Sequence, residues 1–317
     1  MTGLSLALSE ITLVVFTTLA PSGAVALALL CAPIVFGKGP ASTNDGKAGL
    51  IKSLWIPILV TMVGLVASAT HLGNPSNALY VLTGIGRSPL STEVGAAVAF
   101  LAASGLFWLY GFSERPRTGL QRTWAGILVA LAVAFVTAVA FAYCARTIPS
   151  WDTPLVPAAL WCGALTGGPV LALAVLRGAV SPAASRIATV LLAVAGIAAL
   201  AGMGVGIAQG LALPGLHSSL TSADALVPHY WWMLAGATIL QLGGLALAWY
   251  AACHRETNAN GKHPTSAHPA DRKRFAPTSP LAPQRPTLAL AGVSVLVFAG
   301  LFITRFAFYM MHLTSGL

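Results

Sequence analysis

The sequence contains very little charge. Of its 317 residues, 17 are Lys or Arg and 8 are Asp or Glu, so charged residues make up only 8% of the chain. A soluble domain needs about 25% charged residues to cover its surface, whereas this chain is 56% hydrophobic with a mean hydropathy of +0.80. Its main solvent must therefore be lipid. The net charge of +9 then indicates membrane topology and contact with anionic lipid, and it argues against a nucleic-acid partner.

The chain also lacks the residue patterns of metal centres. Its four cysteines, Cys31, Cys144, Cys162 and Cys253, form no C-x-x-C pair, which argues against a zinc site or an iron–sulfur cluster ligated by this chain. No histidine lies in the middle of an apolar run, whereas two b-type haems in a membrane need histidines that face one another. We therefore expect neither a haem nor a metal ion bound by this chain.

Long apolar runs dominate what is present. A helix that crosses a bilayer needs about 20 apolar residues, and backbone amides in lipid must bond within their own segment, so such runs predict helices. Eight runs qualify, at 11–31, 54–71, 94–112, 124–144, 155–176, 187–209, 231–253 and 288–312. The sequence thus predicts an all-α membrane protein, with a single domain over residues 1–317 that is a bundle of eight transmembrane helices.

Lys and Arg residues are distributed unevenly among the connections. Numbered from the first run, the odd connections hold 14 of the 17 basic residues. The positive-inside rule therefore places these connections in the cytoplasm and both termini on the outer side of the cell membrane. The longest of them, at about 255–286, is rich in Pro, Lys and Arg and predicts a flexible cytoplasmic loop.

Titratable side chains gather near the outer ends of the predicted helices. Glu10 precedes the first helix, His71 ends the second and Glu93 begins the third. On the last helix Arg305, Phe308, Tyr309 and His312 follow an i, i+3, i+4, i+7 spacing and so share one face. Ionisable groups near the membrane core are costly, and by default they mark a functional site.

This one-sided distribution fits a site for a lipid-soluble redox molecule. A proton path across the whole bilayer would need polar groups at several depths, and Gln209 and Gln241 do not form such a series. A transporter would need a polar site at the midplane. A glycine stripe, Gly202, Gly206 and Gly210, predicts close helix packing within the bundle.

Several of these residues have structural roles open to them as well. A histidine at the end of a span can serve as an interfacial hydrogen-bonding group. Ser91 is a candidate N-cap, with Glu93 in the first turn facing the helix dipole. Arg305 can extend toward the interface or form an ion pair with Glu10 or Glu93. These roles are compatible with a functional site.

Three segments, "HLGNPSNALYVLTGIGRSPLSTEV", "SEITLVVFTTLAPSG" and "RFAFYMMH", occur in this chain at the second connection, the first span and the last span. Together they resemble one known family, the DmsC membrane anchors of dimethyl sulfoxide reductase-type complexes. The segment "HLGNPSNALYVLTGIGRSPLSTEV" resembles that family's H-L-G-x-P … S-x-L-S-x-E motif. "SEITLVVFTTLAPSG" is similar to its opening E-x-x-L-x-x-F-T, and "RFAFYMMH" to its closing R-x-x-F-Y. The family often has Gln soon after the F-T pair, where this chain has Pro21, which predicts a bent first helix.

The resemblance implies a role in anaerobic respiration. Such anchors contain no haem, oxidise menaquinol near the outer face and pass electrons to an iron–sulfur subunit docked there. The electrons then reach a molybdenum-bis(pyranopterin) subunit, an S-oxide or N-oxide-type reductase. The family's quinol-linked His and Glu correspond to His71 and Glu93, as proton acceptor and as its orienting or relaying partner. Further candidates for the quinol pocket are Asn74, Arg87, Ser91, Arg305 and Tyr309, with Glu10 and His312 as supporting residues.

Three other interpretations stay open at this point. One is a quinol-interacting subunit of the polysulfide reductase type, and another is a multi-span transporter. The third is a structural anchor that binds no quinone.

Overall fold

The computed structural model describes residues 2–71, 78–179, 185–217, 222–260 and 287–313. Throughout these ranges every regular element is a helix, and eight helices are long and apolar enough to cross a membrane. They are α2 (Ile11–Phe36), α4 (Trp55–Ala69), α6 (Pro89–Tyr110), α7 (Thr118–Ala142), α8 (Leu155–Ala179), α9 (Ser185–Ala212), α11 (Tyr230–Asn260) and α12 (Thr287–Met310). The prediction of an all-α bundle of eight spans is confirmed.

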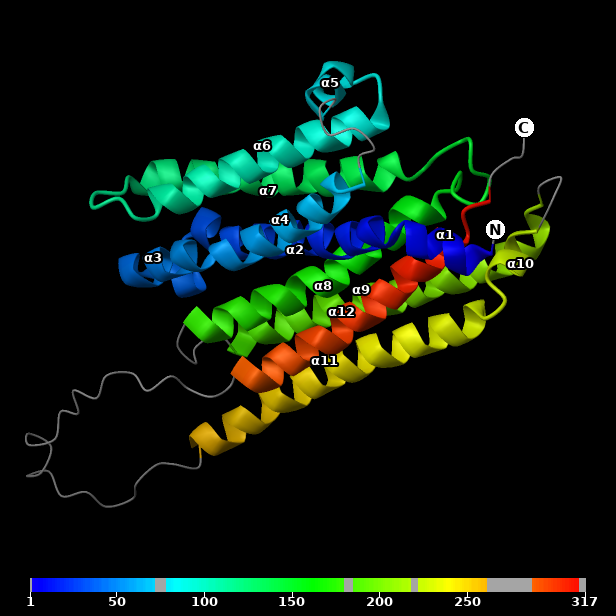
Figure 1. The fold of residues 1–317 in the computed structure, drawn as a ribbon. Coiled ribbons are helices and arrows are strands. Elements are labelled where there is room, and N and C mark those ends of the chain that lie inside the picture. Colours follow the sequence, from blue (N-terminus) through cyan, green and yellow to red (C-terminus); the bar gives the residue numbers. More distant parts are fainter. Residues whose placement is uncertain (1, 72–77, 180–184, 218–221, 261–286, 314–317) are drawn as a thin grey trace, which may run out of the picture.

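Short helices join the spans at both ends of the bundle. They are α1 (Gly3–Ser9), α3 (Asn44–Ser53), α5 (Ala78–Val81) and α10 (Ala223–Leu226), none of which the apolar runs predicted. Both termini lie at one end of the bundle together with α1 and α10, while α3 and the α6–α7 turn lie at the opposite end (Figure 1). Helix α11 continues to Asn260, so the connection predicted from about 255 begins later; residues 261–286 lie outside the described ranges.

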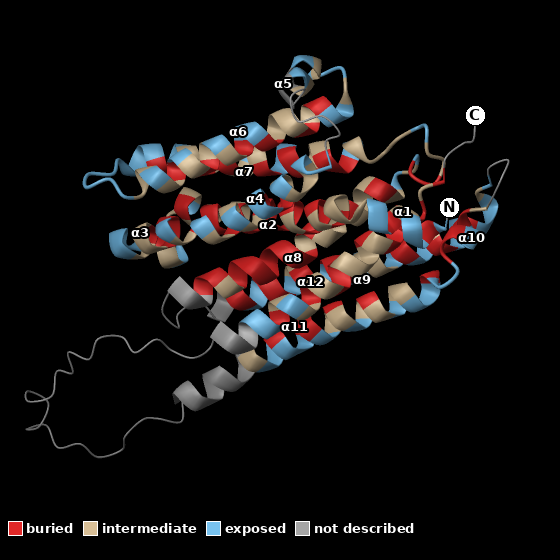
Figure 2. Ribbon diagram, in the orientation of Figure 1, coloured by how far each residue is buried: buried red, intermediate tan, exposed pale blue. Residues whose placement is uncertain are grey.

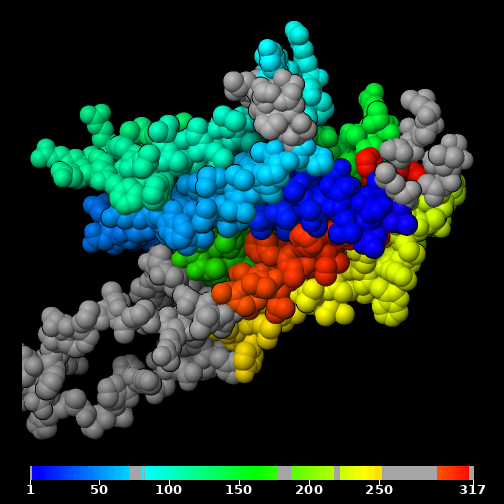
Figure 3. Space-filling view, in the orientation of Figure 1, coloured from blue at the N-terminus to red at the C-terminus, as the bar shows by residue number. Residues whose placement is uncertain are grey.

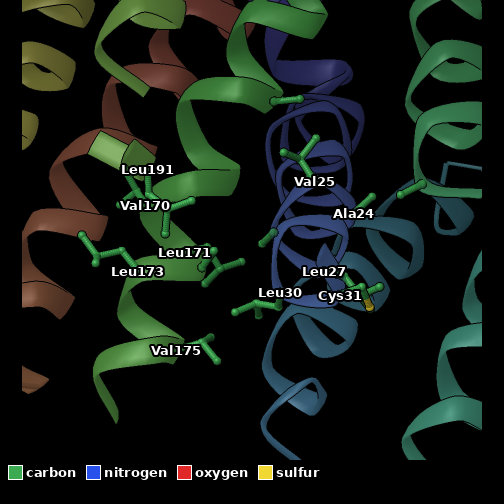
Figure 4. Close-up of a cluster of buried hydrophobic side chains, with 14 of the residues drawn as sticks. Ala24, Val25, Leu27, Leu30, Cys31, Val170, Leu171, Leu173, Val175 and Leu191 are labelled. Carbon is green, nitrogen blue, oxygen red and sulfur yellow. The ribbon is translucent and has the colours of Figure 1, made fainter. Parts of the chain in front are cut away.

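Helix α2 lies at the centre of the bundle. It packs against α4, α7, α8 and α12, and it is buried along most of its length (Figure 2). Figure 4 shows part of the core around it, with Val25 and Leu30 on the side toward α8 and Leu27 and Cys31 on the other side. The helix runs through Pro21 and Pro33 without ending at either. Because α2 is packed against four other helices, the position of Glu10, which directly precedes α2, is fixed as well.

Glycine lets α2 and α4 approach closely. A Cβ atom on Gly23 of α2 would lie 2.9 Å from the carbonyl oxygen of Pro57 and 2.9 Å from the amide nitrogen of Thr61, both on α4. Any side chain there would displace backbone atoms and not merely another side chain. In lipid, small residues allow helices to gain dispersion contacts at short range. This contact therefore sets the distance between the axes of α2 and α4, and with it the distance between the start of α2 and the end of α4.

The glycine stripe of α9 also packs within the bundle, as predicted. A Cβ on Gly206 would meet the Leu234 side chain of α11, and one on Gly210 would meet the rings of Tyr230 and Trp231. The Tyr230 hydroxyl donates a hydrogen bond to the Gly206 carbonyl oxygen at 2.7 Å. The stripe is therefore used for contact between α9 and α11.

Helix α6 begins five residues before the predicted start of its span at 94, and its cap is Ser88 instead of Ser91. The Ser88 side chain accepts a hydrogen bond from the Ser91 amide at 3.4 Å, and Pro89 occupies the first turn, where its fixed φ suits a helix start. The prediction that Ser91 caps the helix is wrong. Glu93 consequently lies beyond the first four amides, where a direct capping role is not available.

Candidate functional site

Glu10 and His71 meet at the end of the bundle that carries both termini. Glu10 is the single residue between α1 and α2, and His71 follows α4. The Nε2 atom of His71 lies 3.2 Å from Oε2 of Glu10, with 42% and 22% of the two side chains exposed. The contact joins residues far apart in the sequence, and it follows from the tight pairing of α2 with α4.

Helix α1 holds Glu10 in place. A Cβ on Gly3 would overlap the carbonyl oxygen of Leu226 in α10 and lie 2.9 Å from that of Met310 in α12, so only glycine fits between these backbones. Thr2 caps the helix by accepting a hydrogen bond from the Ser5 amide at 3.3 Å. Figure 3 shows this blue N-terminal segment lying between α4 and the red end of α12. The carboxylate is thus attached to a packed element.

Glu93 occupies the buried part of the same region. Only 4% of its surface is exposed, and it lies close enough to the phenols of Tyr143 and Tyr309 to interact with them electrostatically. Tyr143 directly follows α7 and Tyr309 lies near the end of α12. The Tyr309 hydroxyl is buried next to Tyr143 and Thr17, yet it forms no aligned hydrogen bond with any described residue.

Aromatic rings connect this buried group to His312. Trp151 stacks on Phe308 with ring centroids 4.6 Å apart and on His312 with centroids 4.8 Å apart, and its indole N–H donates to the Phe308 carbonyl oxygen at 3.3 Å. Burial lowers the pKa of His312, and the nearby carboxylate of Glu10 partly opposes that effect. His312 is therefore a neutral packing group at pH 7, beside the Glu10–His71 contact.

Arg305 is buried but does not form the predicted ion pair. Its surface is 5% exposed, and it pairs with neither Glu10 nor Glu93; in the described ranges the ion-pair contact is His71 with Glu10. The guanidinium carbon lies 6.0 Å from the centroid of the Phe308 ring. The helix turns Arg305 toward α8, α9 and α11, where its neighbours include Gly163 and Cys162.

The other predicted pocket residues are spread out. Arg87 lines an open hollow of about 250 Å³ with Ser88, Thr92 and Phe141, and neither His71 nor Glu93 lines it. Ser91 is buried, and a Cβ on Gly84 would meet its hydroxyl. Asn74 lies outside the described ranges.

The structure thus divides the predicted residues into a contact between the exposed His71 and the half-buried Glu10, and a buried group around Glu93 and Tyr309. Tyr143 and Trp151 belong to the same region, although the sequence did not predict either of them as a site residue. Tyr143 lies at the end of a span like many lipid-facing aromatics, so no sequence signal distinguished it. Among the described residues no three His, Cys, Asp or Glu side chains are placed to hold a metal ion.

Comparison with known proteins identifies the family. The family model of the DMSO reductase anchor subunit (DmsC) matches residues 4–263. The YnfH subunit of an anaerobic dimethyl sulfoxide reductase of Escherichia coli K12 is 31% identical over 312 residues, which cover 96% of this chain and 95% of the relative. The C subunit of anaerobic dimethyl sulfoxide reductase from the same organism is 27% identical over 311 residues, which cover 96% of each of the two sequences. The protein therefore belongs to the DmsC family of DMSO reductase anchor subunits.

Proposed function

We propose that this membrane anchor oxidises menaquinol at the end of the bundle that holds Glu10, His71 and Glu93, and passes the electrons to an iron–sulfur partner. The family membership establishes a membrane anchor of a DMSO reductase complex, whose iron–sulfur and molybdenum cofactors belong to partner subunits. The observation that carries the quinol role is that the Glu10–His71 contact and the buried Glu93 lie at the same end of the bundle. Together they supply a proton acceptor, His71, and a proton relay, Glu93, for a reaction that releases two protons.

In this proposal His71 takes the first proton, with Glu10 beside it. The carboxylate of Glu10 faces Nε2 of His71, so it favours the tautomer with hydrogen on Nε2 and leaves Nδ1 to accept a hydrogen bond from a quinol hydroxyl. Oε2 of Glu10 accepts no well-aligned hydrogen bond within the described part of the chain, so it is available to accept one from Nε2 of His71 when the quinol binds. Once protonated, the imidazolium is stabilised by the adjacent carboxylate.

Glu93 relays the second proton in this scheme, because it can accept a proton from the head group while giving its own proton toward the outer side. A buried carboxyl group interacting with two phenols can hold a proton away from bulk water. The end of the bundle with both termini is, in this proposal, the outer side of the cell membrane, where the iron–sulfur subunit docks. Crosslinks from that subunit should then form with the connections at this end, including 211–230, and not with 255–286.

Quinone analysis of the purified complex tests the function directly. We expect about one menaquinone per complex to be extracted, or one saturable site for an added menaquinone analogue in quinone-depleted complex. A structural anchor would bind none, and a transporter would show no site linked to reduction of the iron–sulfur clusters. Complex that reduces its substrate with viologen but neither contains nor binds quinone would refute the proposal.

Replacing Glu10 by Gln tests the orienting role. The amide keeps the size of the side chain but loses the charge that stabilises the imidazolium, so we expect quinol-dependent turnover to fall about 10- to 100-fold. Turnover with a viologen donor should be unchanged. Asp152→Asn is a matched control, because Asp152 follows Trp151 in a connection at the same end of the bundle. Equal quinol turnover in Glu10→Gln and the wild type would exclude this role.

A further inference from the structure

A polar cavity lies between α8, α9, α11 and α12, apart from the Glu10–His71 contact. Its volume is about 30 Å³, enough for about two water molecules. The polar residues that line it are Thr166, Gln209, Thr238, Gln241, Thr304 and Arg305. Gln209 and Gln241 are too few to form a proton path across the bilayer. The fold nevertheless brings both side chains to one cavity together with the buried guanidinium of Arg305.

The chemistry of the lining favours water over an anion. The hydroxyls of Thr166, Thr238 and Thr304 each donate to a carbonyl oxygen of their own helix, at 2.8, 2.8 and 3.0 Å. The side-chain amide of Gln241 donates to Thr304 at 3.4 Å. The threonines therefore present lone pairs to the cavity. A water molecule can accept from Arg305 and donate to those lone pairs, whereas an anion would be repelled by them.

Arg305 consequently keeps an unneutralised charge. No carboxylate within the described ranges lies within ion-pair distance of it, although only 5% of its surface is exposed. Water in the cavity lowers the cost of that burial without cancelling the charge. A cation in a region of low dielectric acts over a longer range than one in water.

Arg305 also lies close to the proposed quinol site, because Tyr309 follows it one turn later on the same face of α12. Arg305 interacts electrostatically with Tyr143 and Tyr309, and Glu93 interacts with the same two phenols. The buried Tyr309 hydroxyl between them lacks an aligned partner among the described residues. The inner wall of the site thus combines a buried positive charge with the hydroxyl of Tyr309.

We infer that Arg305, hydrated through the cavity, is an electrostatic residue that favours the anionic form of a quinone head group bound beside Tyr309 and Glu93. The inference rests on the proposed function. When the quinol gives its first proton to His71, the remaining quinol anion carries one negative charge, and this is the species that Arg305 stabilises.

A pair of analogues that differ in charge tests this inference. In neutral solution 2-hydroxy-1,4-naphthoquinone is an anion, and its 2-methoxy counterpart is neutral. With Arg305→Gln in the full complex, we expect affinity to fall about tenfold for the anion and less than about threefold for the neutral compound. Arg305→Lys should retain most of the affinity for the anion. Arg117→Gln removes a positive charge at the start of α7, the end far from Tyr143. This substitution should leave the affinity for both analogues unchanged.

Absorbance of the bound analogue gives a second measurement that needs no variant. In wild-type complex the bound hydroxynaphthoquinone should remain anionic to a pH about one unit lower than the same compound in detergent micelles. Arg305 would have a structural role only if Arg305→Gln lowered the affinity for both analogues equally. The same conclusion would follow if the bound hydroxynaphthoquinone lost its charge at the same pH as it does in micelles. If neither analogue binds the wild type, the quinol function itself fails, and that result is seen before any variant is compared.

Discussion

Replacing His71 by alanine should lower quinol-dependent reduction by membranes that carry the full complex at least about 100-fold. In the proposed mechanism Nδ1 of the imidazole accepts the first proton of the quinol, whereas Glu10 lies 3.2 Å from Nε2, the other nitrogen of the ring. Without that acceptor the quinol must lose its electrons while still protonated, which is a costly step. The rate is measured with a menaquinol analogue as donor and the physiological acceptor.

The control is the same complex driven by a reduced viologen, which bypasses the anchor. Viologen-driven turnover and membrane attachment should be unchanged in His71→Ala, since His71 lies at the surface of the bundle and is not part of its core. Thr70→Ala is the matched substitution, because Thr70 is exposed and directly precedes His71 at the same end of α4. Wild-type quinol turnover in His71→Ala would remove the main support for the proposed site.

The sequence predicted the helices well because the signal is local. Each span is an uninterrupted apolar run, and the bilayer requires its backbone to be helical. The start of α6 was misplaced because Ser88-Pro89 is a stronger helix start than Ser91, a preference that depends on the proline at the first position. Short helices such as α1 contain too few residues to give a periodic pattern.

The site was predicted only in part because its contacts are long-range. His71 and Glu93 were found through a motif, but the partner of His71 depends on the approach of α2 to α4 at Gly23. The pairing predicted for Arg305 was wrong because the rotation of α12 about its axis, set by packing, turns this residue toward α8 and α9. The sequence could not predict Tyr143 as a site residue, because its contact with Tyr309 arises only when the ends of α7 and α12 meet in the fold.

The close approach of α2 and α4 leads to the second large effect. In Gly23→Leu the new side chain would meet the Pro57 carbonyl and the Thr61 amide at distances that no real Cβ atom adopts, so the two helices must separate. Overpacking in a core costs typically about 1–3 kcal/mol, and a clash with backbone on both helices leaves little room for relaxation. We expect a lower melting temperature for the detergent-solubilised complex and less anchor in the membrane.

Gly105→Leu provides the comparison, because a Cβ on Gly105 of α6 meets nothing within 4 Å. Both variants add the same side chain to a transmembrane helix, so a difference between them reports the α2–α4 contact and not leucine itself. Separation of α2 from α4 also moves Glu10 away from His71, and the Gly23→Leu complex that does assemble should therefore lose quinol turnover while retaining viologen turnover. If both variants melt alike and turn over quinol alike, the helix contact does not control the geometry of the site.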